Sequence, residues 1–243
     1  RGPFDKLRVT RGAQGDMGTV HNDAGAIDCM NSGSTARMLL GVCAGANLHA
    51  RFDGDASLQR RPMEPVAAQL RAFGAPIETT QGRLPLEIFG CERVQTRHFI
   101  LLSPSAQVKS ALLFAALFAG AAIDITGDAG SRDHTERLLR YLGAEIEWDA
   151  QRIDLRATPA HDLPISVAGD FSAAAFFITG ATIAPGSEIL VRDVGVNPTR
   201  TGLLDALRAL GAEVELRNER VVSGEPIADI ATRHAPLHAI DVD

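Results

Sequence analysis

Apolar and polar positions follow the same order three times along the chain. An amphipathic helical pattern ends in Leu-Arg-x-x-Gly-Ala, and an alternating, strand-like pattern follows at once. The copies span Leu70–Glu78, Leu139–Glu147 and Leu207–Glu215, and their arginines at 71, 140 and 208 lie 69 and 68 residues apart. Glycine is a common signal at a helix C-terminus, and a regular period indicates one supersecondary unit copied along the chain.

A second, more apolar pattern precedes each of these signatures. It begins with small polar residues and continues as a run that is apolar on nearly all sides, over 32–45, 105–120 and 170–180. Such a run predicts a buried helix. Together with the Leu-Arg signature, it predicts βαβαββ-like units in a layered α+β fold with α/β-type repeats. The runs are too short and too often interrupted by polar residues to span a bilayer.

Composition describes an ordinary globular protein and argues against some classes. The 243 residues are 45% hydrophobic and 22% charged, and the net charge of −6 disfavours a general nucleic-acid-binding protein. Cys29, Cys43 and Cys91 are odd in number and lack metal-ligand spacing, which favours a reducing, cytoplasmic location without a disulfide framework. Because the chain begins with Arg1 and the strand-like Lys6–Thr10 enters in mid-repeat, we expect it to be part of a longer protein.

The polar start of the first buried helix is a candidate anion-binding site. Gly33 has no Cβ, and a helix start presents unpaired N–H groups with a partial positive charge. Arg37, one turn further on, is placed to add a charge-assisted contact to an anion. The alternative is a simple serine or asparagine cap beside an arginine paired within the protein, and the sequence leaves both open.

Two further polar segments allow the same pair of interpretations. Ser105 and Gln107 offer a hydroxyl and an amide at the start of the second buried helix, where serine is also an ordinary cap. Arg61 precedes Pro62, a residue suited to the first helical position, so Arg61 either faces a cleft or is a solvated surface residue. Lys109 interrupts the apolar run and must either reach solvent or find partners.

A glycine-containing loop at 127–137 opens onto another helix. Ser131 and Asp133 are candidate caps, and His134 is a candidate base or ligand-contacting ring, with a surface histidine as the alternative. No second histidine or cysteine stands at metal-ligand spacing from His134, so no metal is expected. The sequence also has no nucleophile elbow, Walker loop or dinucleotide-binding fingerprint.

Six segments, taken in order, resemble the 5-enolpyruvylshikimate-3-phosphate synthase family. They are Asn31–Arg37, Gly54–Met63, Ser105–Ser110, Ser131–Glu136, Gly169–Ala174 and Asn197–Gly202. The resemblance implies a two-lobed enolpyruvyl transferase fold, an inside-out α/β barrel of βαβαββ units, which is incomplete here. It implies most of the first lobe in residues 1–160 and the first unit of the second lobe in residues 161–243.

The same resemblance implies a reaction. The family transfers the enolpyruvyl group of phosphoenolpyruvate to the 5-hydroxyl of shikimate 3-phosphate and releases phosphate, in the shikimate pathway of aromatic amino-acid biosynthesis. Glyphosate is the family's inhibitor. The resemblance implies no metal, no organic cofactor, no nucleic acid and no membrane. The proton-transfer carboxylates are expected in the parts of the family that this sequence does not match, so no catalytic residue is assigned.

The binding residues carry over position by position. The phosphoenolpyruvate site takes Asn31, Gly33, Ser34, Arg37, Arg61 and Gln107. The shikimate-3-phosphate site takes Ser105, Ala106, Gln107, Ser131 and His134. Ala106 replaces a hydroxyl found in some members, so only its backbone can serve. His134 stands where the family frequently has tyrosine.

Two other interpretations compete with this one. UDP-N-acetylglucosamine enolpyruvyl transferases have a similar fold, but they use a cysteine in a glycine-rich loop, and no cysteine here has that setting. The other interpretation is a non-catalytic fragment or substrate-binding lobe that needs a complementary chain or associates with itself. A chain that is one part of a longer or split enzyme would, for its part, expose a large apolar surface near 169–180 and associate with itself.

Overall fold

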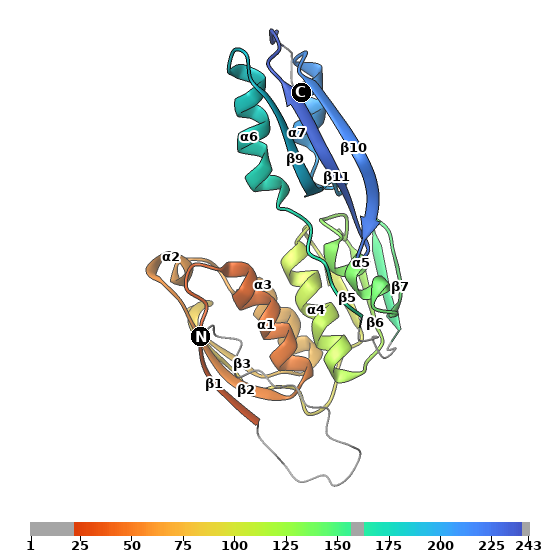
Figure 1. Cartoon of the computed structure of the whole chain (residues 1–243). Helices are drawn as coiled ribbons and strands as arrows, with labels where there is room; N and C mark the ends of the chain where they lie inside the picture. Colours follow the sequence, from red (N-terminus) through yellow and green to blue (C-terminus); the bar gives the residue numbers. More distant parts are fainter. Residues whose placement is uncertain (1–21, 157–162, 240–243) are drawn as a thin grey trace. The chain divides into compact units, whose positions relative to one another are not determined.

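The computed structural model describes residues 22–156 and 163–239, which form two compact units. The first unit contains residues 22–131 and 144–156, and the second contains residues 132–143 and 163–239. Figure 1 shows the elements of both units in sequence colours. The strand predicted at Lys6–Thr10 lies outside the described residues. The assignment of two lobes divided at residue 160 stays a prediction.

The first repeat builds a four-stranded sheet with helices between its strands. Its elements are β1 (Asn22–Asp28), α1 (Gly33–Gly45), β2 (Leu48–Asp53), α2 (Ala56–Gln59), α3 (Glu64–Phe73), β3 (Ile77–Thr80) and β4 (Arg83–Ile88). The strand order is β1-β2-β4-β3, in which β1 and β2 are parallel and the other pairs are antiparallel.

The second repeat has the same topology. Its elements are β5 (His98–Leu101), α4 (Ala106–Ala119), β6 (Ile123–Gly127), α5 (His134–Tyr141), β7 (Glu145–Trp148) and β8 (Arg152–Arg156). The strand order is β5-β6-β8-β7, again with one parallel pair followed by antiparallel pairs. Helix α5 groups with the second compact unit, although the strands on either side of it belong to the first.

The third repeat follows the same plan with its first strand reduced to a single bridge. Its elements are α6 (Phe171–Ile183), β9 (Glu188–Gly195), α7 (Gly202–Ala209), β10 (Glu213–Val222) and β11 (Glu225–Arg233). The sheet order is β10-β11-β9, and Gly169 forms a parallel bridge with Val194 of β9. The predicted α+β fold of repeated βαβαββ units is therefore confirmed.

The glycine of each repeated signature reverses the chain after a helix. Gly74, Gly143 and Gly211 follow α3, α5 and α7 and have φ values of 126°, 89° and 94°. Residues with a Cβ rarely adopt this conformation. The signature thus ends the surface helix and directs the chain into the next strand, as predicted.

Helices α1 and α4 pack side by side in the interior of the first unit (Figure 1). The predicted burial of α4 is confirmed, because residues 108–113 and Ala115 and Ala116 are buried. Helix α1 is buried along the face that carries Ala36, Leu40 and Ala44.

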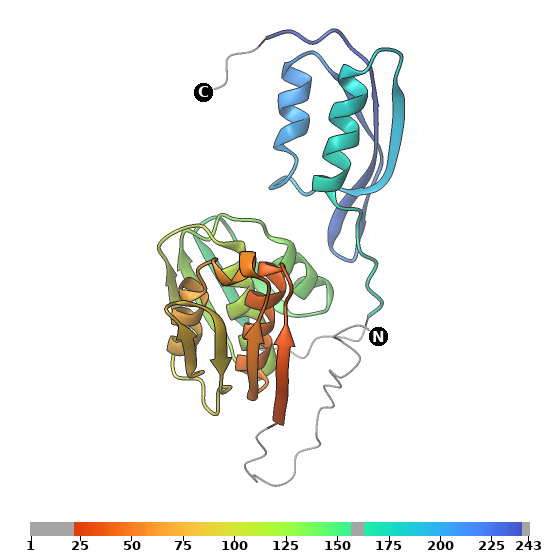
Figure 2. The ribbon, with the colours of Figure 1, turned by 90° about the vertical axis from the view of Figure 1, so that its left-hand side faces the viewer.

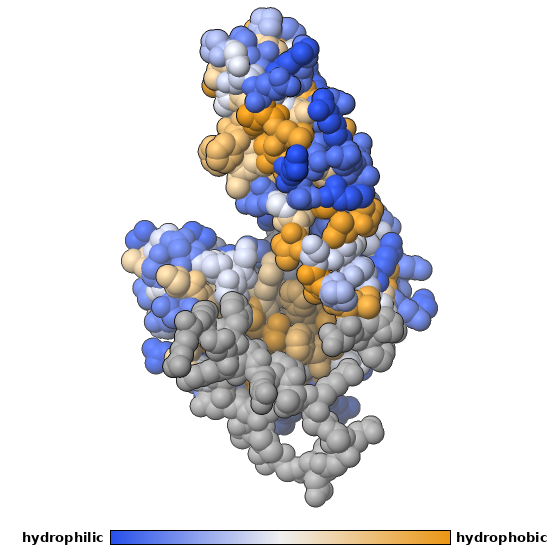
Figure 3. Space-filling model, in the orientation of Figure 1, coloured by the Kyte–Doolittle hydropathy of each residue, from blue (hydrophilic) through white to orange (hydrophobic). Residues whose placement is uncertain are grey.

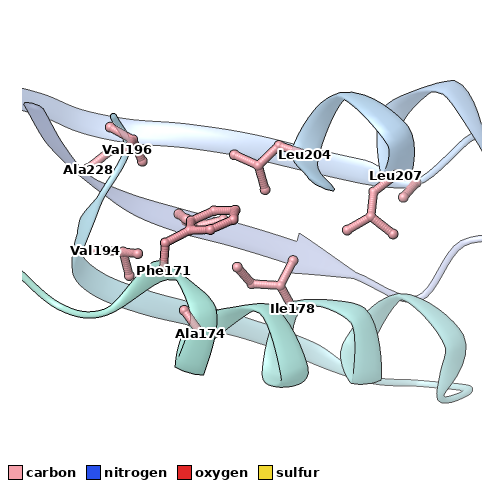
Figure 4. Close-up of a cluster of buried hydrophobic side chains, with 10 residues drawn as sticks. Phe171, Ala174, Ile178, Val194, Val196, Leu204, Leu207 and Ala228 are labelled. Atoms are coloured by element: carbon pink, nitrogen blue, oxygen red, sulfur yellow. The ribbon is translucent and has the colours of Figure 1, made fainter. Parts of the chain in front are cut away.

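The second unit has a core of its own. Helices α6 and α7 lie side by side against one face of the three-stranded sheet (Figure 2). Phe171 and Ile178 of α6 meet Leu204 and Leu207 of α7 above this sheet (Figure 4). Each fully buried side chain of this kind contributes about 1.5–3 kcal/mol relative to an exposed one.

The outer face of α6 departs from the sequence prediction. Phe176 and Phe177 are 81% and 70% exposed, and Ile183 is 60% exposed. In the space-filling view, hydrophobic residues reach the surface of the second unit (Figure 3). Burial on all sides, predicted from the apolar run, is wrong for this helix because only one side of it has a packing partner within the described residues. The apolar surface predicted near 169–180 is present.

Candidate anion-binding site

The start of α1 is held by a tight turn. Met30 has φ 50°, and the N–H of Ser32 donates to the carbonyl of Cys29 at 2.8 Å. The Oγ of Ser32 accepts from the N–H of Thr35 at 3.1 Å. Ser32 is therefore the N-cap, and Gly33 becomes the first helical residue. The capping interpretation is correct for Ser32, and the predicted site residues lie on either side of this cap.

Arg37 and Gln107 join the starts of the two central helices. Arg37 Nη1 donates to Gln107 Oε1 at 2.8 Å, and Gln107 Nε2 donates to Ser34 Oγ at 2.7 Å. Arg37 Nη2 donates to the carbonyl of Pro62 at 2.8 Å. Three of the predicted residues from segments about 70 positions apart thus form one hydrogen-bonded chain.

Arg61 reaches the same place from the other side. Its Nη2 donates to Asn31 Oδ1 at 2.8 Å, and Asn31 Nδ2 donates to Asp55 Oδ2 at 2.7 Å. Asp55 is itself fixed, because its Oδ1 accepts from the N–H groups of Ser57 and Leu58 at the start of α2. The hydrogen bonds that link Arg61 to Asn31 and Asn31 to Asp55 hold the exposed guanidinium of Arg61 in one direction.

Pro62 does not begin a helix, contrary to the sequence expectation. Helix α3 starts at Glu64, Pro65 is its second residue, and Met63 is its N-cap. Pro62 instead leaves its carbonyl to the guanidinium of Arg37. The residues after Arg61 are thereby tied to α1.

The two guanidinium groups converge on the bare α-carbon of Gly33. A Cβ built there would lie 2.8 Å from Arg37 Nη1 and 3.3 Å from Arg61 Nη1. Burial, and then the positive charge of Arg61, lower the pKa of Arg37. Two cations placed this close at a helix N-terminus repel each other, so an anion between them would be stabilised by both charges and by the helix dipole.

The start of α4 lies in the same unit, beside the turn that ends at Ser131. Ser105 is the N-cap of α4, with its Oγ 3.4 Å from the N–H of Val108, and Ala106 is the first helical residue. Lys109 is 1% exposed, and its Nζ donates to the carbonyls of Ala129 and Ser131 at 3.3 and 3.1 Å. Lys109 therefore finds partners rather than reaching solvent, and it ties the Ser131 turn to α4.

The side chain of Ser131 is the next candidate ligand contact at the start of α4. Its Oγ is buried and has no hydrogen-bond partner within the described residues. A buried hydroxyl without a partner is costly, which makes it a candidate to bind a ligand oxygen. Ser131 does not cap α5.

His134 belongs to the second unit, whereas the polar cluster described above belongs to the first. It is the first residue of α5, and its Nδ1 is 2.9 Å from Glu225 Oε1. Asn197 Nδ2 donates to Glu225 Oε2 at 3.3 Å and to Asp133 Oδ1 at 2.7 Å. Asp133 occupies the cap position of α5 without capping it, because its carboxylate accepts from Arg137 and Asn197. His134 and Glu225 line a pocket of about 370 Å³ in this unit.

Within the described residues, the cysteines form no disulfide and the potential metal ligands form no metal site. The thiols of Cys29, Cys43 and Cys91 are buried and unpaired, and burial is the main cause that raises the pKa of Cys29 to about 11 and of Cys43 to about 12. Over residues 22–156 and 163–239, no group of three or more His, Cys, Asp or Glu side chains could hold a metal ion. In the same residues, no helix has the length and apolar character needed to cross a membrane.

The sequence did not predict that two further residues, Asp55 and Lys109, support the site. Asp55 orients Asn31, and Lys109 fixes the Ser131 turn. Asp55 stands directly before α2 in a position typical of an N-cap, so its local role could have been predicted. Its contact with Asn31, 24 residues away, leaves no signal in the sequence.

The fold is that of an enolpyruvyl transferase. The enolpyruvyl transferase NikO from Streptomyces tendae superposes with a TM-score of 0.54 at 16% identity, over 81% of this chain and 46% of that one. At this identity, the likeness concerns the fold alone. EPSP synthase from Acinetobacter baumannii superposes with a TM-score of 0.78 at 38% identity, over 91% of this chain and 49% of that one.

The sequence places the chain more narrowly. Residues 5–243 match the family model of EPSP synthase (3-phosphoshikimate 1-carboxyvinyltransferase), and the chain belongs to that family. The 3-phosphoshikimate 1-carboxyvinyltransferase of Legionella pneumophila strain Paris is 40% identical over 98% of this chain and 55% of its own length. That of Acidithiobacillus ferrooxidans is 45% identical over 89% of this chain and 50% of its own length. The chain thus spans about half the length of the curated relatives it matches.

Proposed function

We propose that this chain acts in enolpyruvyl transfer from phosphoenolpyruvate to the 5-hydroxyl of shikimate 3-phosphate, with release of phosphate. Its part is to hold the two anionic substrates. The observation that carries the proposal is the convergence of Arg37 and Arg61 on Gly33 at the start of α1. Membership of the EPSP synthase family supports this choice of substrates.

In this proposal, phosphoenolpyruvate lies at the arginine pair. Arg37 and Arg61 neutralise its charge, and Gly33 leaves the space that the anion needs. Asn31, Ser34 and Gln107 act through the arginines, because their hydrogen bonds hold the guanidinium groups in place. Prior placement of charge of this kind is usually the largest contribution to stabilising a charged transition state.

Shikimate 3-phosphate would lie at the start of α4. Ser105, Ala106 and Gln107 present a hydroxyl, a backbone N–H and an amide there, and the unpartnered Oγ of Ser131 adds a second hydroxyl. Gln107 belongs to both proposed sites, so it lies where the substrates meet. His134 stays a proposed contact to shikimate 3-phosphate.

The proton transfers need other groups. The hydroxyl of shikimate 3-phosphate must lose a proton and the methylene carbon of phosphoenolpyruvate must gain one. Asp55 is a poor proton donor, because hydrogen bonds from Leu58 and then Asn31 lower the pKa of its carboxyl. We therefore assign binding and orientation, and no proton transfer, to the cluster at Gly33.

Two features point to the setting of the protein. The exposed Phe176, Phe177 and Ile183 of α6 form a surface that a complementary chain or a second copy would cover. Free buried cysteines agree with a reducing compartment, and we propose the cytoplasm.

The test is calorimetric titration of the chain with shikimate 3-phosphate, then phosphoenolpyruvate, followed by an assay of released phosphate. Arg61→Ala should weaken phosphoenolpyruvate binding, whereas Arg60→Ala, its exposed neighbour of equal charge, should not. Binding without phosphate release supports a substrate-holding role. Phosphate release would overturn the assignment of proton transfer to other groups. Absence of binding, or equal loss in both variants, would overturn the proposed sites.

A further inference from the structure

A regular seam joins α1 to α4 below the anion site. Three pairs of residues face each other along it: Arg37 with Gln107, Gly41 with Ala111, and Gly45 with Ala115. The members of every pair are 70 residues apart, and successive pairs are four residues apart on both helices. Residues four apart lie on one helix face, so the two helices run parallel and in register along this seam.

The seam brings the two backbones unusually close. A Cβ built on Gly41 would lie 2.1 Å from the carbonyl oxygen of Ala111, and one built on Gly45 would lie 2.1 Å from that of Ala115. Ala111 and Ala115 are fully buried. The obstacle at both levels is backbone rather than a flexible side chain, so it cannot move aside without moving the helix.

We infer that Gly41 and Gly45 are positioning residues that set the distance between the starts of α1 and α4, and hence the Arg37–Gln107 contact of the anion site. Arg37 and Gln107 occupy the same seam, one helical turn before Gly41 and Ala111. Its hydrogen bond of 2.8 Å forms because the two helices are allowed to touch below it. Gly41 and Gly45 have no side chain that could itself contact the guanidinium of Arg37 or the amide of Gln107.

The size of the effect depends on the distance along the helix. Ordinary contact of a Cβ begins at 3.4 Å, so a methyl group at either glycine requires the helices to separate locally by roughly 1.3 Å. With a rise of 1.5 Å per residue, Gly41 lies about 6 Å and Gly45 about 12 Å from Arg37 along α1. Separation at Gly41 therefore carries the 2.8 Å contact beyond hydrogen-bonding distance, whereas separation at Gly45 opens mainly the far end of the seam.

The experiment compares three variants of the full chain by nuclear magnetic resonance. Gly41→Ala and Gly45→Ala make equal steric demands at different distances from the site. Cys43→Ala lies between them in sequence but about 200° around the helix from Gly41, and it removes a buried thiol away from the seam. The readout is the side-chain amide signal of Gln107, identified by its absence in Gln107→Ala.

We expect Gly41→Ala to shift or broaden the Gln107 amide signal, Gly45→Ala to change it less, and Cys43→Ala to leave it in place. All three variants lose stability, so unfolding temperature alone would not separate them. An unchanged signal in folded Gly41→Ala, or equal changes in all three variants, would overturn the inference. This readout needs no ligand, so its outcome does not depend on the proposed function.

A second readout rests on the proposed function. Phosphoenolpyruvate should bind Gly41→Ala about tenfold more weakly than the unmodified chain, because one charge-assisted contact is misplaced, and Gly45→Ala less than about threefold more weakly. If the unmodified chain does not bind phosphoenolpyruvate, the proposed function fails, while the amide signal still decides the role of the glycines. Equal weakening by both variants would contradict the graded effect.

Destabilised variants are measured in trimethylamine N-oxide, an osmolyte that favours compact states. If Gly41→Ala still does not fold, Ala111→Gly and Ala115→Gly replace the glycine pair, because each loosens α4 at one level of the seam. Ala111→Gly, one turn from Gln107, should perturb the amide signal more than Ala115→Gly. The reverse order would overturn the inference.

Discussion

Replacing Gly33 with alanine should separate anion binding from stability. The added methyl group would lie 2.8 Å from Arg37 Nη1 and 3.3 Å from Arg61 Nη1, between the two guanidinium groups. It fills the space that we propose for the anion. Loss of one charge-assisted contact corresponds to about 1.5–3 kcal/mol, or roughly a 10- to 150-fold weaker affinity for phosphoenolpyruvate.

The same change should leave the fold intact. The atoms that the methyl group meets are the ends of flexible side chains, and Arg37 Nη1 needs to move by about 0.6 Å to reach the 3.4 Å of ordinary contact. Alanine is also a better helix former than glycine, by up to about 1 kcal/mol. The unfolding temperature should therefore stay constant or rise by no more than about 4 °C.

Gly202→Ala is the matched control. Gly202 is the first residue of α7, and nothing lies within 4 Å of a Cβ built there. Calorimetric titration with phosphoenolpyruvate and thermal unfolding are measured for both variants. Unchanged affinity in Gly33→Ala, or an equal loss of affinity in Gly202→Ala, would refute the reasoning. A large loss of stability in Gly33→Ala would refute the claim that only the anion needs this space.

Three further outcomes are expected. Arg61→Met should weaken phosphoenolpyruvate binding by about 2 kcal/mol, roughly 30-fold, and by less in high salt, and a loss that does not vary with salt would contradict a charge effect. Burial holds the pKa of Cys29 at about 11 and of Cys43 at about 12 against 9.0 for a free thiol, so the stability from these neutral thiols is complete below pH 9 and is lost as pH rises from 9 to 12. The free energy of unfolding, measured by denaturation between pH 9 and pH 12, should show that loss, and the loss should be smaller in Cys43→Ala. An equal loss in Cys43→Ala would count against the buried thiol as its cause. Changing both Phe176 and Phe177 to serine should reduce self-association in sedimentation experiments and alter stability by less than about 0.5 kcal/mol, because both rings are exposed. If the unmodified chain is already monomeric at high concentration, self-association through these two rings is contradicted.

Local sequence patterns predicted the fold because each repeat contains the signals for its own helices and strands. Gly74, Gly143 and Gly211 end helices in all three copies, and their positive φ is a property of the backbone at one residue. Ser32 and Ser105 cap their helices for an equally local reason. The buried helices were also predictable, except where burial depends on a neighbour, as on the outer face of α6.

The resemblance named residues that lie together in the first unit, but it did not predict the contacts between them. The resemblance named Arg37, Arg61 and Gln107, but it did not indicate that Gln107 bridges Arg37 and Ser34. Helical periodicity likewise showed an apolar run at Gly41 but not that its glycines touch another backbone. Such contacts join segments about 70 residues apart, and no local rule relates one to the other.

The sequence by itself determined the repeat, the glycine-terminated helix ends and the family, because these depend on residue type and spacing within short segments. The tertiary structure decided which helices touch, where the two arginines converge, and which partners Asp55 and Lys109 take. It also placed His134 against Glu225 within the second unit. The physical reason is that packing and charge act through distance in space, which the order of residues along the chain does not specify.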